Sequence, residues 1–211
     1  MITIKSSTLK ALLITASKDK THHRLHGVHF CRRADYVDVL YASTDGKRLT
    51  IATEPLPEEI DESDPSEGIL PINFCEQALK LQSKLLSKIS FSFSLYSSPD
   101  PTVHGRIVVT HTASGLHTQL VDGRYPDYAR VIPRTFSGEV SQFNPADLAD
   151  VAKIQKIIGD KNPPYILHNG KEAVLIVFHR GDMVQVMSSM HIKNAPPTVP
   201  AWLPGPGPET A

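Results

Sequence analysis

The sequence predicts an α+β fold built from three copies of one β-α-β-β-β unit. Two observations support this prediction. A short strand, a helix, a further strand and a hairpin follow one another three times, with starts near residues 1, 68 and 137. Within each copy, apolar residues alternate in the expected strands and recur every three to four residues in the expected helix. Each copy is therefore expected to fold as one structural unit.

The first unit occupies the N-terminal part of the chain. The residues MITIK alternate as a short strand, and TLKALLITA, at residues 8–16, has apolar residues at helical spacing. LHGVHFC, at residues 25–31, alternates as the next strand. YVDVLYAST and RLTIAT then flank Asp45-Gly46, a dipeptide favoured in tight turns, so the unit is expected to end in a hairpin.

The second unit repeats this order. GILPI, at residues 68–72, predicts a strand, and CEQALKLQSKLL, at residues 75–86, predicts a helix. KISFSFSLY, at residues 88–96, alternates with a clean period of two and predicts the next strand. A hairpin turning near Ser114-Gly115 completes the unit.

The third unit has the same plan and the clearest helix start. GEVSQF, at residues 138–143, predicts the first strand. Asn144-Pro145 supplies a cap and a proline at the first helical position, and ADLADVAKIQKII, at residues 146–158, predicts the helix. PYILHN, at residues 164–169, and a hairpin turning at Arg180-Gly181 follow.

A single unit of this kind cannot bury both faces of its helix and its sheet. Two units related by pseudo-symmetry can pair their helices and cover each side of the pair with a sheet. The open sheet edges then favour edge-to-edge pairing with the next domain. Such a chain curves, with helices inside and sheets outside, and it is able to close into a ring, although the sequence does not require closure.

Composition sets limits on the function. The chain carries 22 Lys/Arg and 22 Asp/Glu, so no overall basic field indicates nucleic acid, although residues 1–53 are locally basic. The two cysteines, Cys31 and Cys75, predict neither a disulfide scaffold nor a metal site. Neither a signal-peptide pattern nor an apolar run of membrane-spanning length is present in the sequence. A soluble cytoplasmic protein with no membrane partner is expected.

Two segments closely resemble the bacterial DNA polymerase III beta subunit, the sliding clamp. They are STDGKRL, at residues 43–49, and LVDGRYPDYARVIP, at residues 120–133. LHGVHF, at residues 25–30, and QVMSSMHI, at residues 185–192, are similar to two further strands of that family. The resemblance covers nearly the whole chain up to residue 192, and it implies the sliding-clamp fold with helices inside and sheets outside.

The resemblance also implies one and a half clamp domains. Residues 1–124 resemble the family's middle domain, residues 125–136 form a connector, and residues 137–193 resemble the latter half of the last domain. Residues 194–211, rich in Pro and Gly, are expected to be a disordered tail. A homo-oligomer is expected: a twelve-unit ring needs four chains, or the third unit pairs with its counterpart in a second chain. An open or linear assembly is equally permitted.

In the family, the connector forms one wall of a surface pocket that receives short linear peptides from polymerases and repair factors. Apolar walls suit a Leu/Phe anchor, methionine adapts to several partners, and arginines are expected to pair with peptide carbonyls or carboxylates. Lys47, Ser188 and Ser189 depart from the family pattern, which predicts an altered peptide preference. Plain packing between domains is the alternative role for these positions. The matching positions are Leu25, Thr44, Gly46, Arg48, Leu49, Pro126, Arg130, Val131, Val186, Met187 and Met190.

The family places DNA-contacting residues just before the strand at residues 25–31. The loop SKDKTHHR, at residues 17–24, occupies that place. Its basic side chains are expected to meet phosphates of double-stranded DNA without reading bases, and an ordinary solvated turn is an equally good interpretation. The candidate residues are Lys18, Lys20, His23 and Arg24.

No catalytic site, cofactor or metal is predicted. The sequence lacks a phosphate-binding glycine loop and a nucleophile elbow. Four histidines, His22, His23, His26 and His29, are spaced so that a strand would point them to alternating faces, and they are not expected to bind a metal. The resemblance implies a noncatalytic clamp-like processivity or tethering factor in DNA replication, which binds DNA nonspecifically and recruits DNA polymerase or repair factors. The alternative is an interaction module that binds peptides or another clamp without encircling DNA, and an enzyme is the least favoured class.

Overall fold

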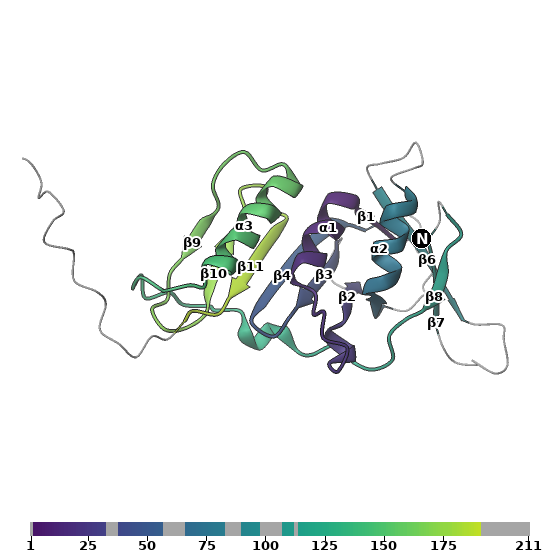
Figure 1. Cartoon of the computed structure of the whole chain (residues 1–211), viewed down its shortest axis with the longest axis horizontal. Coiled ribbons are helices and arrows are strands. Elements are labelled where there is room, and N and C mark those ends of the chain that lie inside the picture. The colour runs from purple at the N-terminus through teal and green to yellow at the C-terminus, as the bar shows by residue number, and fades with distance from the viewer. Residues whose placement is uncertain are drawn as a thin grey trace, which may run out of the picture.

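The structure, a computed structural model, describes residues 2–32, 38–56, 66–82, 90–97, 107–111 and 114–190. The tail predicted at residues 194–211 and most of the acidic crossover after residue 54 lie outside them. Within the described part, helices and strands follow the predicted order, with one exception given below. Figure 1 shows the third unit on one side of the first unit and the second unit on the other.

The first strand of the first unit belongs to the sheet of the second unit. β1 (Ile2–Lys5) leads directly into α1 (Ser6–Thr15), yet it pairs with β6 (Ser90–Ser97). β7 (Ile107–His111) and β8 (His117–Gln119) continue that sheet in the order β1-β6-β7-β8. The first unit therefore completes the sheet of the second.

The second unit makes the reciprocal exchange. β5 (Glu67–Pro71) leads directly into α2 (Ile72–Gln82), yet it pairs with β2 (Gly27–Arg32) of the first unit. β2 is followed in the sheet by β3 (Asp38–Thr44) and β4 (Arg48–Pro55), which form the hairpin predicted around Asp45-Gly46. Each sheet of this domain thus contains strands from both units.

The third unit continues the same sheet rather than forming a separate one. β4 pairs in antiparallel fashion with β11 (Met183–Met187), which is followed by β10 (Val174–Val177) and β9 (Tyr165–Leu167). The resulting seven-stranded sheet has the order β5-β2-β3-β4-β11-β10-β9. The edge-to-edge junction expected from the sequence is thus the pairing of β4 with β11, which we call the seam.

α3 (Pro145–Ile158) has the ends that its sequence predicts. Asn144 is the N-cap, and its side-chain oxygen accepts a hydrogen bond of 2.9 Å from the backbone N–H of Ala146. Pro145 occupies the first turn, and Gly159 ends the helix with a positive φ of 73°, which glycine adopts without steric cost.

The first strand predicted for the third unit is wrong. Residues 138–143 form no strand, and the side chain of Val140 is 82% exposed. Isolated hydrogen bonds fix this segment: the N–H of Gly138 donates to the carbonyl of His168, and the N–H of Met190 donates to the carbonyl of Gln142. In the first two units, the corresponding strands pair with the sheet of the other unit. The third unit has no such neighbour within the described chain, so the alternating pattern alone does not produce a strand.

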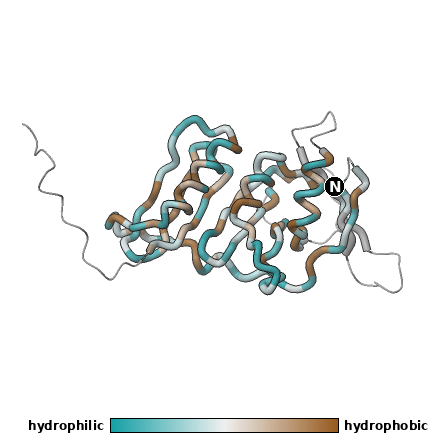
Figure 2. Tube along the Cα trace, in the orientation of Figure 1, coloured by the Kyte–Doolittle hydropathy of each residue, from teal (hydrophilic) through white to brown (hydrophobic). Residues whose placement is uncertain are grey.

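Two hydrophobic cores share α1. Leu9 and Leu12 pack between the two sheets with residues such as Phe30 and Tyr41, whereas Ala11 belongs to the core formed by α3 and the third unit's strands. Figure 2 shows apolar and polar positions alternating along the helices. Ile14 of α1 also packs against that second core, so α1 ties the third unit to the first two through apolar contacts. No helix in the described ranges has the length and apolar character needed to cross a membrane.

Candidate functional site

The connector (residues 125–136) covers the face of the seven-stranded sheet that points away from the helices. Ala42, Leu49, Ile51 and Val186 form an apolar cluster on that face, and Tyr128 of the connector packs against it. Figure 1 shows the connector, with its short helix η3 (Tyr128–Val131), running below β3 and β4 in this view. A segment that spans two units is thus also part of their packing.

Two tyrosines, Tyr125 and Tyr128, anchor the connector to the sheet. Tyr125 is buried and stacks on His29 of β2, with ring centroids 4.8 Å apart. Tyr128 meets both rings edge-on, at 5.8 Å from His29 and 6.1 Å from Tyr125. Burial lowers the pKa of His29, with Glu67 opposing, and burial raises the pKa of Tyr125. Both rings are therefore neutral near pH 7, and such aromatic contacts stabilise by about 0.5–1.5 kcal/mol each.

A pocket of about 230 Å³ opens beside this aromatic cluster, at the seam. The β3–β4 turn, the connector and the end of β11 each contribute to its walls. Both the first and the third unit are therefore needed to build it. Its lining residues are Leu25, Thr44, Gly46, Lys47, Arg48, Leu49, Pro126, Asp127, Tyr128, Val131, Ala173, Val186 and Ser188.

The structure brings eight of the eleven residues assigned to the pocket together in its walls, and three lie elsewhere. Met187 is fully buried in the core beneath α3, because neighbouring residues of a strand point to opposite faces and Val186 faces the pocket. The Arg130 side chain is 84% exposed and pairs with Asp127 at 2.9 Å. Met190 follows the end of β11 and is exposed.

Five lining residues are absent from the set predicted from the sequence: Lys47, Asp127, Tyr128, Ala173 and Ser188. The alternation of side chains along a strand would have predicted Ser188 as a lining residue, because it lies two residues after Val186 and therefore on the same face. Tyr128 and Asp127 stand inside the connector motif. Ala173 carries no signal in the sequence, because only the position of the loop before β10 brings it to the pocket.

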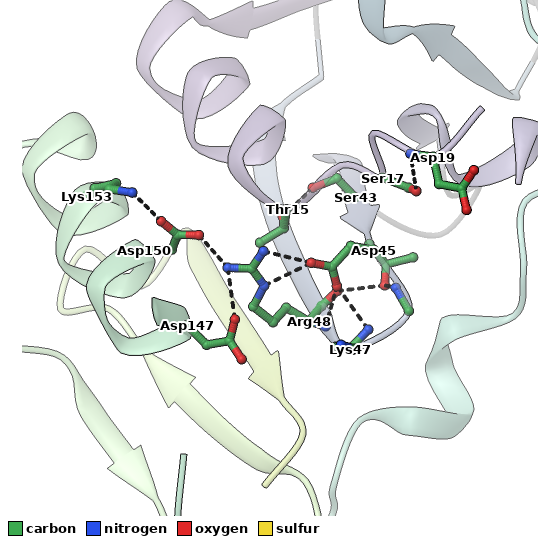
Figure 3. Close-up of polar contacts among 12 residues, drawn as sticks. Thr15, Ser17, Asp19, Ser43, Asp45, Lys47, Arg48, Asp147, Asp150 and Lys153 are labelled. Atoms are coloured by element: carbon green, nitrogen blue, oxygen red, sulfur yellow. Dashed lines mark hydrogen bonds and ion pairs between the residues drawn. The ribbon is translucent and has the colours of Figure 1, made fainter. Parts of the chain in front are cut away.

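Arg48 links the two units across the seam. Figure 3 shows its guanidinium group between Asp45 of the β3–β4 turn and two carboxylates of α3. Its nitrogens lie 2.7 Å from Asp45, 2.5 Å from Asp150 and 3.4 Å from Asp147. The side chain is only 12% exposed, and Lys153 adds a further cation 2.6 Å from Asp150. The guanidinium groups of Arg48 and Arg130, which were expected to contact a bound peptide, thus form ion pairs with aspartates of the same chain.

The turn that carries Arg48 is held by its own side chains. Asp45 accepts hydrogen bonds from the backbone N–H groups of Lys47 (2.9 Å) and Arg48 (2.8 Å), and Thr44 donates to the carbonyl of Arg48. Gly46 has a φ of 89°, a conformation that favours glycine. This wall of the pocket is therefore well ordered before any ligand arrives.

The four residues predicted to meet DNA lie in one exposed loop between α1 and β2. Lys18 and Lys20 are exposed on either side of Asp19, which caps the loop by accepting a hydrogen bond from the N–H of Thr21 at 2.8 Å. His23 and Arg24 are also exposed, in the short helix η1 (His23–Leu25). Arg24 lies over Gly123, where a Cβ would come within 2.9 Å of its Nε. The loop thus approaches the segment that leads into the connector.

Repeated units and edge-joined sheets with helices on one face are a fold that this chain shares with solved DNA sliding clamps. A family profile for the central domain of the DNA polymerase III beta subunit matches residues 3–127. The chain belongs to the DNA polymerase III beta subunit family.

Curated relatives and solved structures agree with this assignment. The beta sliding clamp of Synechocystis sp. is 26% identical over 161 residues, which are 73% of this chain and 39% of the relative. That of Caulobacter vibrioides is 28% identical over 120 residues, which are 56% of this chain and 29% of the relative. The chain thus spans less than two fifths of the length of these relatives.

Among solved structures, the Caulobacter crescentus beta sliding clamp has a TM-score of 0.67 at 18% identity, covering 90% of this chain and 65% of that one. The Helicobacter pylori beta clamp bound to a DNA ligase peptide has a TM-score of 0.64 at 14% identity, with the same coverage. At these identities, the structural similarity shows the fold alone.

We expect the Arg48→Gln variant to lower the free energy of unfolding by about 1–3 kcal/mol, because three partly buried carboxylates lose their shared cation. Urea denaturation measures this change. Arg130→Gln is the matched control: Arg130 also pairs with an aspartate three residues before it, but at 84% exposure its loss should cost less than about 0.5 kcal/mol. Equal losses in the two variants would contradict the linking role of Arg48.

Stability is also expected to fall in acid through Asp150. Burial acts to raise the pKa of this carboxyl group, but Lys153 and Arg48 outweigh that effect and hold the pKa below its ordinary value of 3.8. A carboxyl group with a lower pKa in the folded state stabilises fully above its unfolded pKa and loses this contribution as pH falls through the folded value. Unfolding free energies measured from about pH 6 to pH 2 should therefore decline less steeply in Asp150→Asn, and an identical slope would rule the effect out.

Proposed function

We propose that this chain is a noncatalytic clamp-type accessory factor that binds short peptide motifs of replication or repair proteins at the seam pocket. The supporting observation is a pocket whose apolar wall, which includes Leu25, Leu49, Val131 and Val186, is assembled from four separate segments. Such a pocket accepts one or two bulky apolar side chains of an extended peptide, as in other peptide-recognition grooves. The H. pylori clamp, which has the same fold, is bound to a DNA ligase peptide.

The surroundings of the pocket favour a peptide that carries acidic residues beside its apolar anchor. Arg24, Arg124 and Arg130 line an adjoining hollow together with Pro126, and Asp127 is its acidic member. Pro126 and Asp127 also line the seam pocket, so the two sites share a wall. A carboxylate in the hollow would form charge-assisted hydrogen bonds with guanidinium groups. Arg130 therefore contributes to charge selection beside the pocket rather than to the pocket itself.

A fluorescent peptide ending in Leu-Phe, with acidic residues before the anchor, tests the pocket by anisotropy titration. Val131→Asp should weaken binding about tenfold or more, because it places an unpaired charge against an apolar anchor. Leu81→Asp, an equal change at an exposed position of α2, is the control and should leave the affinity unchanged. Equal affinities for the parent and Val131→Asp would place the peptide elsewhere.

The same proposal includes nonspecific contact with double-stranded DNA through the loop between α1 and β2. Lys18, Lys20, His23 and Arg24 are all exposed there, and the chain has no net charge that would attract DNA to its whole surface. Local phosphate contacts of this kind are weak and sensitive to salt, which suits a protein that has to slide.

Replacing Lys18 and Lys20 with alanine should weaken binding to any duplex sequence alike and reduce the slope of log K against log salt by up to about 2. Lys161→Ala with Lys171→Ala removes the same charge from exposed positions of the third unit and serves as the control. If the two double variants behave alike, the loop is not the DNA contact. Peptide binding in the absence of any DNA binding would instead leave the chain as an interaction module.

A further inference from the structure

The third unit is half of a clamp domain, and the first two units show what completes it. In their domain, β1 crosses from the first unit to β6 of the second, and β5 crosses from the second unit to β2 of the first. Each of these strands ends at the residue before its helix begins. A complete domain thus requires two units that exchange their first strands.

In the third unit, the sequence of the outgoing strand is present at residues 138–143, but these residues form no strand and join no sheet in the described structure. Residues 138–143 lie directly before the cap of α3, as β1 and β5 lie directly before α1 and α2. Ile2 and Ile69, in the two paired strands, are buried, whereas Val140 is 82% exposed. The difference is not one of residue type, since all three are β-branched apolar residues with high strand propensity.

The sheet edge that would receive an incoming strand, at β9, also has no further strand beside it in the described structure. β2 is flanked by β3 and β5, and its residues Val28 and Phe30 are fully buried. β9 is the corresponding strand of the third unit, but in the described structure it pairs with β10 alone, and Tyr165 is 61% exposed. Figure 1 shows β9 at the outer end of the sheet, and Figure 2 shows apolar positions along it.

The β9 edge strand itself is apolar and lacks the features that protect natural edges. β9 contains neither a charged residue nor a proline, which are the usual means of preventing strand addition. Large exposed apolar side chains also gather on the third unit rather than over the whole described surface. Those of the third unit and the segment leading into it are Phe136, Val140, Leu148, Tyr165, Leu167 and Met190, against Leu81 and Val131 elsewhere.

We propose that two copies of this chain exchange residues 138–143, so that each copy adds its segment to the β9 edge of the other. The same segment and the same edge then serve in both directions, which is the self-complementary arrangement of a two-fold dimer. Two third units form one complete domain at the centre, with the first and second units of each copy on either side. This dimer deepens the homo-oligomer expected of a clamp-type factor, but it requires neither peptide nor DNA.

The exchange replaces weak contacts with a continuous ladder. In the single chain, the segment makes isolated backbone bonds near the end of β9, from Gly138 to His168 and from Gly170 to Glu139. In the dimer, its backbone groups gain a ladder of the kind that β1 forms with β6. Val140, Tyr165 and Leu167 lose contact with water, and each buried apolar side chain contributes to association.

The test is the mass of the full chain in solution, measured by light scattering after size exclusion. We expect twice the 23.2 kDa mass of one chain at tens of micromolar. Val140→Asp and Tyr165→Asp should each shift the protein to a single copy, because a charge would enter the joined sheet; both side chains are exposed in the single chain, so its folding should be preserved. Leu81→Asp should stay dimeric. Hydrogen exchange at Tyr165–Leu167 should slow as concentration rises.

Three outcomes would overturn the dimer: a parent protein that stays a single copy, variants that dimerise as well as the parent, or a parent that dimerises only after residues 194–211 are removed. The last result would mean that the tail of the same chain occupies the edge. Peptide titration of the single-copy Val140→Asp variant keeps the two proposals separate. If this variant binds the peptide with the affinity of the parent protein, the pocket functions without the dimer. If the parent protein dimerises but binds no peptide, the proposed pocket function is wrong and the dimer proposal stands.

Discussion

The antiparallel pairing of β4 with β11 joins the third unit to the first, and the pocket, the Arg48 ion pairs and the shared use of α1 all depend on its register. Leu49 lies opposite Val186, and both face the connector. Arg48 lies opposite Met187, and both face α3. A slip of one residue would reverse these faces, turning the guanidinium group of Arg48 toward the connector and an apolar side chain toward the carboxylates of α3.

The same pairing has a cost. Thr50 and Gln185 lie opposite each other on the helix side and are fully buried, and neither side chain has a hydrogen-bond partner in the described structure. Buried polar groups of this kind cost about 1–3 kcal/mol each. The apolar contacts of α1 with α3 and the charges around Arg48 must offset that penalty. The stability of the seam therefore depends both on apolar packing and on the Arg48 ion pairs.

Local signals in the sequence predicted local structure well. Asn144-Pro145 and Gly159 set the ends of α3, and Asp45-Gly46 shaped the β3–β4 turn. The alternation in residues 138–143 failed as a strand signal because a strand also needs a neighbour, which periodicity cannot supply. Arg48 lines the seam pocket, but its partners Asp147 and Asp150 lie about a hundred residues away in the sequence, and only the fold brings them together.

The walls of the pocket come from two units that are joined by the β4–β11 pairing, by the packing of α1 against α3 and by the Arg48 ion pairs, so ligand binding and the joining of the units are linked. A ligand that needs both walls binds the joined arrangement and not the parted one, so by reciprocity it must hold the units together. At a free concentration one hundred times its dissociation constant, this tightening amounts to about 2.7 kcal/mol. The binding of such a ligand would therefore be coupled to the stability of the seam, and its dissociation would remove that added stability.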